Sequence, residues 1–176
     1  MRIPSLITGL LLVAFASPVF AQQASREDFK QYCQMWEGRW VGDVTWVTDW
    51  PGFGKKGDKV TAYFEAKMVE DGNLMTTRFF GGAGSGTGII LYDASAKQIK
   101  LMWATSSGSM SQGVAFKKNG QWVEKGSGSL ADGTKTEHTS MLAISEEGKT
   151  HTWTGSGSVG DEKTDDQHDV WQRVGK

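Results

Sequence analysis

The feature that most constrains this chain is a series of short strand-like segments between Trp36 and the C-terminus. Gly-containing dipeptides such as Asp71-Gly72, Asn119-Gly120 and Asp132-Gly133 separate the segments and tolerate the positive φ of tight hairpin turns. Strands joined so closely pair as an antiparallel meander, and closing a meander into a barrel removes its exposed edges. The sequence therefore predicts an all-β fold, a single antiparallel up-and-down β-barrel of about ten strands. The expected strands are 39–49, 59–69, 74–80, 87–93, 98–104, 109–118, 121–131, 134–144, 149–157 and 168–174.

A short helix is expected before the first strand, over residues 25–35. Ser25 with Asp28 three residues later has the spacing of a capping box. Apolar side chains then recur at helical spacing, which predicts a helix with one apolar face that closes one end of the barrel. These side chains are Phe29, Tyr32, Cys33 and Trp36. Because Cys33 lies on that face, we expect a buried and unreactive thiol.

The first 21 residues have the pattern of a cleavable signal peptide. Met1-Arg2 forms a basic start, an apolar stretch runs from Leu6 to Phe15, and Val19-Phe20-Ala21 is a small-residue cleavage site. The apolar stretch is too short for a membrane-spanning helix, so we expect no membrane insertion. The sequence therefore predicts a signal peptide at 1–21, a barrel domain at 22–176, and a periplasmic or secreted protein.

The charge and cysteine content narrow the function classes. Without Arg2, one of 19 basic residues, the mature chain would carry 18 basic residues against 20 acidic ones. A nucleic-acid or anionic-membrane partner needs a basic face, so we expect neither. Cys33 is the only cysteine, and no internal disulfide can form. Stability must then come from an apolar interior, for which eight Trp are available.

Hairpin registers predict which side chains line the interior, because the length of a turn determines the residues that share a face. Two-residue turns at Asn119-Gly120, Asp132-Gly133 and Glu147-Gly148 would connect four consecutive strands. The face assigned to the interior comprises Met110, Gln112, Val114, Phe116, Val123, Lys125, Ser127, His138, Ser140, Leu142, Ile144, His151 and Trp153.

That predicted inner face carries a polar cluster, which is the candidate ligand site. Buried polar groups without partners are costly, so they bond one another, hold water or contact a ligand. A structural or water-filled network remains an alternative. The cluster consists of Gln112, Lys125, Ser127, His138 and Ser140, with Phe116 and Trp153 as apolar neighbours.

The Asp71-Gly72 turn predicts a second set of neighbours. Met68 would pair with Met75 and Phe64 with Phe79 on the inner face, and Arg78 would lie opposite Glu65 outside. Arg78 is then half of a surface ion pair, worth less than about 1 kcal/mol, rather than an internal carboxylate clamp.

Other motifs indicate loops. The Gly-rich run 81–88 precedes a strand and lacks the Lys of a phosphate loop, so we expect a connection at the barrel rim. The acidic stretch 161–169 lacks calcium-loop spacing and is expected to be solvated. The segment 50–57 is long for a hairpin loop. It is either a lid with Phe53 pointing inward or a mobile connection.

Both ends of the predicted barrel resemble the lipocalin-like (calycin) β-barrels. In that group a Gly-x-Trp opens the first strand, as Gly38-Arg39-Trp40 does here, and an Arg of the last strand packs over the indole, as Arg173 would. The resemblance implies one barrel with an internal cavity and carries over no catalytic residue. The segments that resemble an uncharacterised bacterial lipocalin-like family are 36–40, 88–93, Trp103 with 106–108, 132–133 and 171–173.

Cofactors are not expected from the residues. His138 and His151 would face inward several residues apart, whereas a zinc ion needs three or four ligands that converge within about 2 Å. Zinc, or haem held by one inward His as in haem-binding relatives of this barrel class, remain alternatives.

The function expected from these observations is non-covalent binding of a small apolar or amphiphilic molecule in the barrel. Gln112, Lys125 and His138 would orient a polar head, and Lys125 would suit an anionic one. The alternatives are an enzyme with His138 as general base beside Lys125, and a scaffold barrel filled by its own side chains.

Overall fold

The computed structural model describes residues 23–145 and 147–175, and the predicted signal peptide at 1–21 lies outside them. A single helix, α1 (Arg26–Trp36), precedes the strands in this part of the chain, and a 3-10 turn, η1 (Glu70–Gly72), joins β2 to β3. The strands are β1 (Gly38–Thr45), β2 (Lys59–Val69), β3 (Leu74–Gly81), β4 (Gly84–Asp93), β5 (Gln98–Thr105), β6 (Met110–Lys118), β7 (Gln121–Ser129), β8 (Lys135–Ile144), β9 (Thr150–Val159), β10 (Glu162–Lys163) and β11 (Gln167–Gly175).

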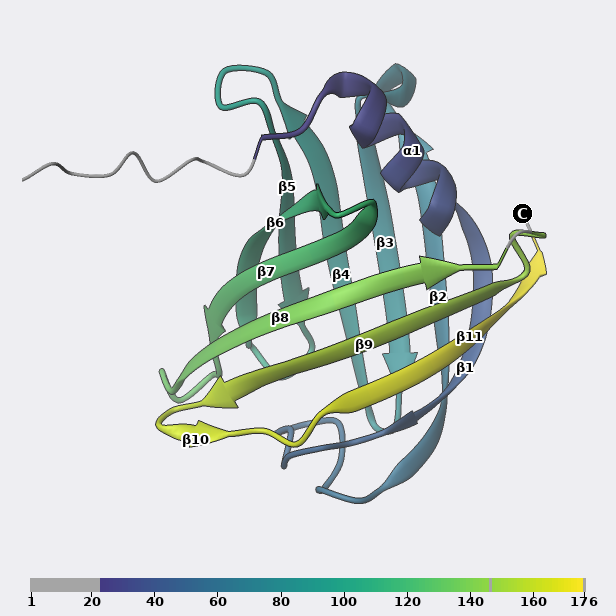
Figure 1. Ribbon diagram of the computed structural model, residues 1–176. Coiled ribbons are helices and arrows are strands. Elements are labelled where there is room, and N and C mark those ends of the chain that lie inside the picture. The colour runs from purple at the N-terminus through teal and green to yellow at the C-terminus, as the bar shows by residue number, and fades with distance from the viewer. Residues whose placement is uncertain (1–22, 146, 176) are drawn as a thin grey trace, which may run out of the picture.

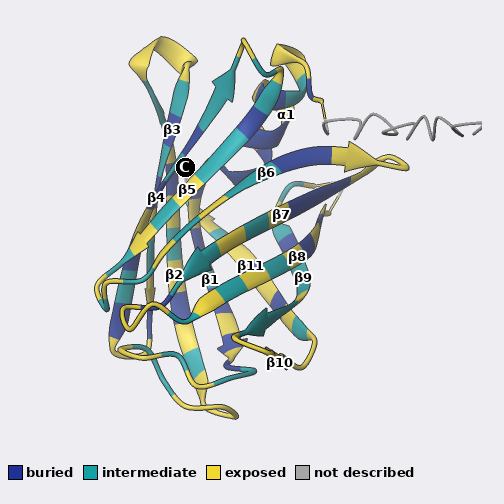
Figure 2. Cartoon of the chain, turned by 90° about the vertical axis from the view of Figure 1, so that its left-hand side faces the viewer, coloured by how far each residue is buried: buried dark blue, intermediate teal, exposed yellow. Residues whose placement is uncertain are grey.

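These strands form a closed antiparallel barrel, which confirms the predicted fold class (Figure 1). Neighbours in sequence pair from β1 to β9, and β11 closes the barrel between β9 and β1. The short β10 adds to the end of β9. Buried and exposed residues alternate along the strands, as expected for a wall with an inner and an outer face (Figure 2). Within the described residues, no helix is long and apolar enough to cross a membrane.

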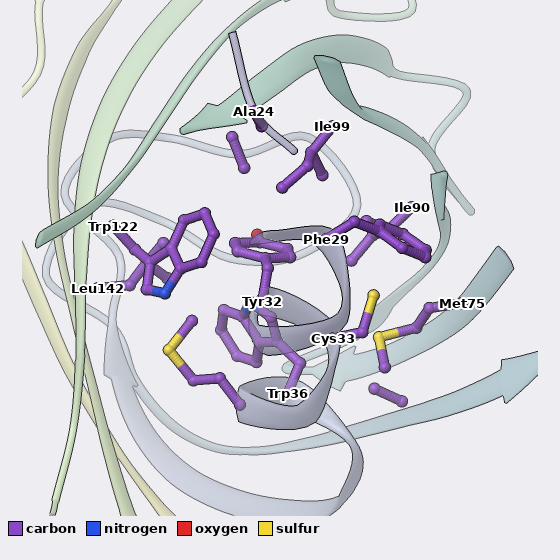
Figure 3. Close-up of a cluster of buried hydrophobic side chains, with 13 residues drawn as sticks. Ala24, Phe29, Tyr32, Cys33, Trp36, Met75, Ile90, Ile99, Trp122 and Leu142 are labelled. Atoms are coloured by element: carbon purple, nitrogen blue, oxygen red, sulfur yellow. The ribbon is translucent and has the colours of Figure 1, made fainter. Parts of the chain in front are cut away.

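The helix α1 covers one end of the barrel. Ser25 accepts a hydrogen bond from the Asp28 N–H and donates to the Asp28 carboxylate, so the predicted capping box forms. Tyr32 packs edge-on against Trp122 of β7, with ring centroids 5.1 Å apart (Figure 3). Burial raises the pKa of the Cys33 thiol to about 12, in agreement with the expected inert cysteine. The end of the barrel at α1 is therefore closed by a packed apolar cluster.

Trp40 and Arg173 join the helix to the closing strands. The Arg173 guanidinium lies 4.1 Å from the centre of the Trp40 ring, the arrangement expected from the sequence. Arg173 also donates hydrogen bonds to the carbonyls of Met35, Glu37 and Gly148, and Trp40 Nε1 donates to the Trp36 carbonyl. One side chain of β11 thereby holds the end of α1 and the turn between β8 and β9.

At the other end, the loop between β1 and β2 folds across the strand ends (Figure 1). The Phe53 ring points into a second apolar cluster, with its centroid 5.6 Å from Trp46 and 6.1 Å from Phe79. The Phe53 carbonyl accepts a hydrogen bond from the Ala83 N–H.

The register between β2 and β3 agrees with the sequence. Met68 pairs with Met75 and Phe64 with Phe79, and Glu65 lies opposite Arg78. The Arg78 guanidinium, however, lies 5.3 Å from the centre of the Phe80 ring, so its contact is with an aromatic neighbour on the outer face.

Candidate functional site

The barrel contains a cavity of about 410 Å³ that is partly open to solvent. It extends from Tyr32 and Trp36 at the helix end to Trp46 and Phe53 at the loop end. Its wall is largely apolar, and ten of the lining residues are Trp, Phe or Tyr. The aromatic side chains between the two ends include Phe64, Phe79, Trp103, Trp153 and Trp171.

Glycines determine how two of these indoles lie. A Cβ added at Gly86 would lie 2.7 Å from Trp103 Cε2, and one at Gly88 would lie 2.8 Å from Trp103 Cζ3. Trp103 therefore covers these two of the three glycines of β4, so its ring lies along the wall. Trp171 covers Gly42 in the same way, since a Cβ there would lie 2.7 Å from Trp171 Cδ2. Because glycine has no side chain, the indole rings can lie against the wall at these positions and leave the lumen open.

The register predicted across Asp132-Gly133 is wrong by one residue. The Leu130 N–H donates to the Thr134 carbonyl and the Gly133 N–H to Leu130, while Gly133 has φ +88°. Ala131 and Asp132 are thus the central turn residues, and Gly133 is an additional left-handed residue in a three-residue loop. An odd loop shifts the pairing by one, which reverses the face of every side chain on one side of the turn.

Three of the five residues of the predicted polar cluster consequently lie on the outer face of the barrel. Gln112 pairs with Ser127 and Val114 with Lys125 as expected, but on the outer face, where Gln112, Lys125 and Ser127 are exposed. They border a second hollow, on the outer surface, and Gln112 also contributes to the lining of the cavity. Phe116 is buried but pairs with Val123 on the same outer face, and it does not line the cavity.

The other two members of the cluster lie inside. His138 and Trp153 line the cavity, and Ser140 is buried beside them on the inner face. Burial lowers the pKa of His138, and the nearby Glu124 carboxylate offsets part of this effect. Lys125 cannot assist His138, because the strand wall separates them.

Glu124 is the inner-wall residue of β7 that the sequence analysis missed. It is buried, and it accepts hydrogen bonds from the Tyr32 hydroxyl, from Ser140 Oγ at 3.0 Å and from Trp153 Nε1 at 3.4 Å. Burial and the Glu124 charge hold the pKa of Tyr32 well above its usual value. The correct register was the signal that would have found Glu124, since it lies between Trp122 and Gly126 on the inner face.

Asp169 of β11 is the second acidic group that the sequence analysis assigned elsewhere. It lies at the end of the stretch expected to be a solvated loop, yet it is only 6% exposed and lines the cavity. Its Oδ2 accepts a hydrogen bond from Gln167 Nε2 at 2.8 Å, whereas Oδ1 has no protein partner. Burial raises the pKa of the Asp169 carboxyl to about 6. The sequence signal that could have found Asp169 is Trp171: residues two apart on a strand share a face, so a buried Trp171 implies an inward Asp169.

The remaining histidines have different environments. His151 is fully buried between Trp36 and Trp40, and both of its ring nitrogens lack protein partners. Burial and the Arg173 charge lower the pKa of His151 to about 4, so this side chain is neutral at ordinary pH. His168 is exposed opposite Thr154. In the described part of the chain, no three His, Cys, Asp or Glu side chains form a group that could hold a metal ion.

Comparisons with known proteins agree with the barrel. No family model matches the chain, and no curated protein matches it at a significant level. Among solved structures, the crystal structure of Rv2717c from M. tuberculosis is similar, with a TM-score of 0.57. The match covers 82% of this chain and 96% of that chain at 16% sequence identity. A likeness at this identity shows the fold alone.

Proposed function

We propose that this protein binds a small apolar or amphiphilic molecule non-covalently in the barrel cavity. The observation that carries the proposal is the aromatic cavity of about 410 Å³ in a barrel whose two ends are covered by α1 and by the loop carrying Phe53. A volume of this size is within the range of small-molecule sites. The covered ends would shield part of a bound apolar molecule from water.

The expected source of affinity is the apolar wall. Each Å² of apolar ligand surface removed from water contributes roughly 25 cal/mol, and part of the sum is lost to the entropy of association. Indoles held against the wall, as Trp103 and Trp171 are, lose little further freedom when a ligand binds. Such preorganisation favours binding.

The polar end of the ligand would contact the inner polar groups of the cavity. Because Lys125 is exposed on the outer face, it no longer supports a preference for anionic heads. The alternative of an enzyme with His138 as general base loses support for the same reason, because Lys125 does not lie beside His138 in the cavity. His138 itself still lines the cavity. A completely filled scaffold barrel agrees poorly with the volume of the cavity.

The lipocalin-like ends and the predicted signal peptide extend the proposal. Gly38, Trp40 and Arg173 support a place among the lipocalin-like binding barrels. Export directed by residues 1–21 would place ligand binding in the periplasm or outside the cell.

Native mass spectrometry and a neutral fluorescent probe test the proposal. We expect a mass excess that disappears on denaturation, or, for the empty protein, saturable binding of N-phenyl-1-naphthylamine. Leu101→Trp adds volume on the cavity wall and should weaken probe binding at least roughly tenfold, a change of about 1.4 kcal/mol. Met141→Trp makes the same kind of change on the exposed outer face and should have little effect. A bare mass together with no saturable probe binding would contradict the binding proposal.

A further inference from the structure

The charged side chains along the cavity are acidic. Glu124, Glu137 and Asp169 line it, and among the described lining residues there is neither Lys nor Arg. Glu137 is exposed and lies on the outer face opposite Ser127, so the carboxylates directed inward are those of Glu124 and Asp169. An anionic ligand would meet repulsion here with no basic side chain to offset it.

The two inward carboxylates differ in their free bonding capacity. Glu124 already accepts bonds from Tyr32, Ser140 and Trp153, so its oxygens are engaged by the protein. Asp169 has one oxygen bonded to Gln167 and one, Oδ1, that is buried without a protein partner. No ion pair among the described residues includes Asp169. A buried carboxylate in this state is stabilised by a partner that brings a donor or a positive charge.

Aromatic side chains surround this carboxylate. Trp153 lies directly opposite Asp169 on β9, and Trp171 follows two residues later on the same face of β11. Directly opposite residues such as Asp169 and Trp153 are about 4.5–5.5 Å apart at Cβ. Asp169 and Trp171 are about 6.6 Å apart along their strand, so both indoles are within reach of one ligand group at Asp169. Indole faces attract organic cations by about 0.5–2 kcal/mol, more when water is excluded.

We propose that the cavity ligand is an amphiphilic organic cation whose ammonium group pairs with Asp169 between Trp153 and Trp171. This inference rests on the proposed binding function and names the ligand class. The ammonium donates a hydrogen bond to Asp169 Oδ1, and the apolar remainder extends along Trp103 and Phe79. Both the acidic wall and the aromatic faces favour a cation over an anion of the same shape.

Calorimetry with three probes of equal chain length tests the inference. The probes are octylammonium, 1-octanol and octanoate, measured at about pH 7.5, where Asp169 is ionised. We expect octylammonium to bind at least roughly tenfold more tightly than octanol, equivalent to about 1.4 kcal/mol, and octanoate to bind most weakly.

Two variants locate the effect. Asp169→Asn keeps the side-chain shape and should lower octylammonium affinity roughly tenfold, while octanol binding changes less than about threefold. Asp43→Asn removes one negative charge from the exposed outer face of the neighbouring strand and should change neither affinity appreciably. Thermal unfolding of both variants verifies that they fold.

The outcomes separate the two proposals. Octanol binding as tight as octylammonium binding, or an unchanged preference in Asp169→Asn, would overturn the cation inference and leave the binding function intact. Absence of binding by all three probes would overturn both.

Discussion

At the scale of single residues, burial of the Asp169 carboxylate lowers the unfolding free energy of the ligand-free protein by an amount that depends on pH. The pKa of its carboxyl rises from 3.8 to about 6 on burial. A folded-state pKa above the unfolded value means that the folded state binds more protons between these values, so stability falls as pH rises through this range. Well below the unfolded-state pKa of 3.8 the carboxyl is protonated in both states and the cost disappears.

Asp169→Asn should therefore stabilise the ligand-free protein at neutral pH. The expected gain in unfolding free energy is up to about 3 kcal/mol near pH 7.5, because one pKa unit corresponds to about 1.4 kcal/mol. The gain should approach zero at about pH 3, below the unfolded-state pKa of 3.8. Urea unfolding of both proteins at the two pH values measures it. A gain that is the same at both would contradict burial of an ionisable carboxyl at this position.

The Glu124 network allows a second residue-scale prediction. Tyr32→Phe removes the hydroxyl that donates to Glu124 and should lower the unfolding free energy by about 1–3 kcal/mol. The double variant with Glu124→Gln should be less destabilised than the sum of the single variants, since both groups belong to one network. Tyr63→Phe, an exposed tyrosine on the outer face, is the matched control and should cost little. Additive losses would show that the two side chains act independently.

At the scale of elements, the register between β7 and β8 includes a three-residue loop that places Gly133 in the left-handed region. Gly133 adopts φ +88°, and a Cβ there would have open space around it. Gly133→Ala should therefore lower the unfolding free energy by about 1–2 kcal/mol through backbone strain alone. Gly133→Asn should lose less, because Asn tolerates this conformation. Chemical unfolding measures both, and equal losses would argue against strain as the cause.

At the scale of the whole molecule, Arg173 connects parts of the chain that are far apart in sequence. It stacks on Trp40 and bonds to carbonyls of α1 and of the turn between β8 and β9. Arg173→Lys keeps the charge but cannot make these bonds together, so it should destabilise the barrel by about 1–3 kcal/mol. Amide exchange should accelerate near Met35 and Gly148. Arg78→Lys, on the exposed outer face, is the control and should leave these amides unchanged.

Much of the architecture was determined by the sequence alone. Alternating segments, left-handed turn residues and the Ser25–Asp28 capping box are local patterns, and they predicted the strands, the helix and the closed barrel. The β2–β3 and β8–β9 registers were also predictable. In both connections the observed strand pairing is the one that a two-residue turn at Asp71-Gly72 or Glu147-Gly148 would produce.

The interior of the barrel was decided by tertiary structure. Asp132-Gly133 fits a two-residue turn and a three-residue loop equally well in sequence, and only pairing of the complete strands selects the second. That single residue moved Lys125 outward and Glu124 inward. Asp169 stands in an acidic stretch that looks solvated, but the closing position of β11 between β9 and β1 buries it. Side-chain direction depends on long-range closure, so the acidic, aromatic cavity could not be derived from local pattern.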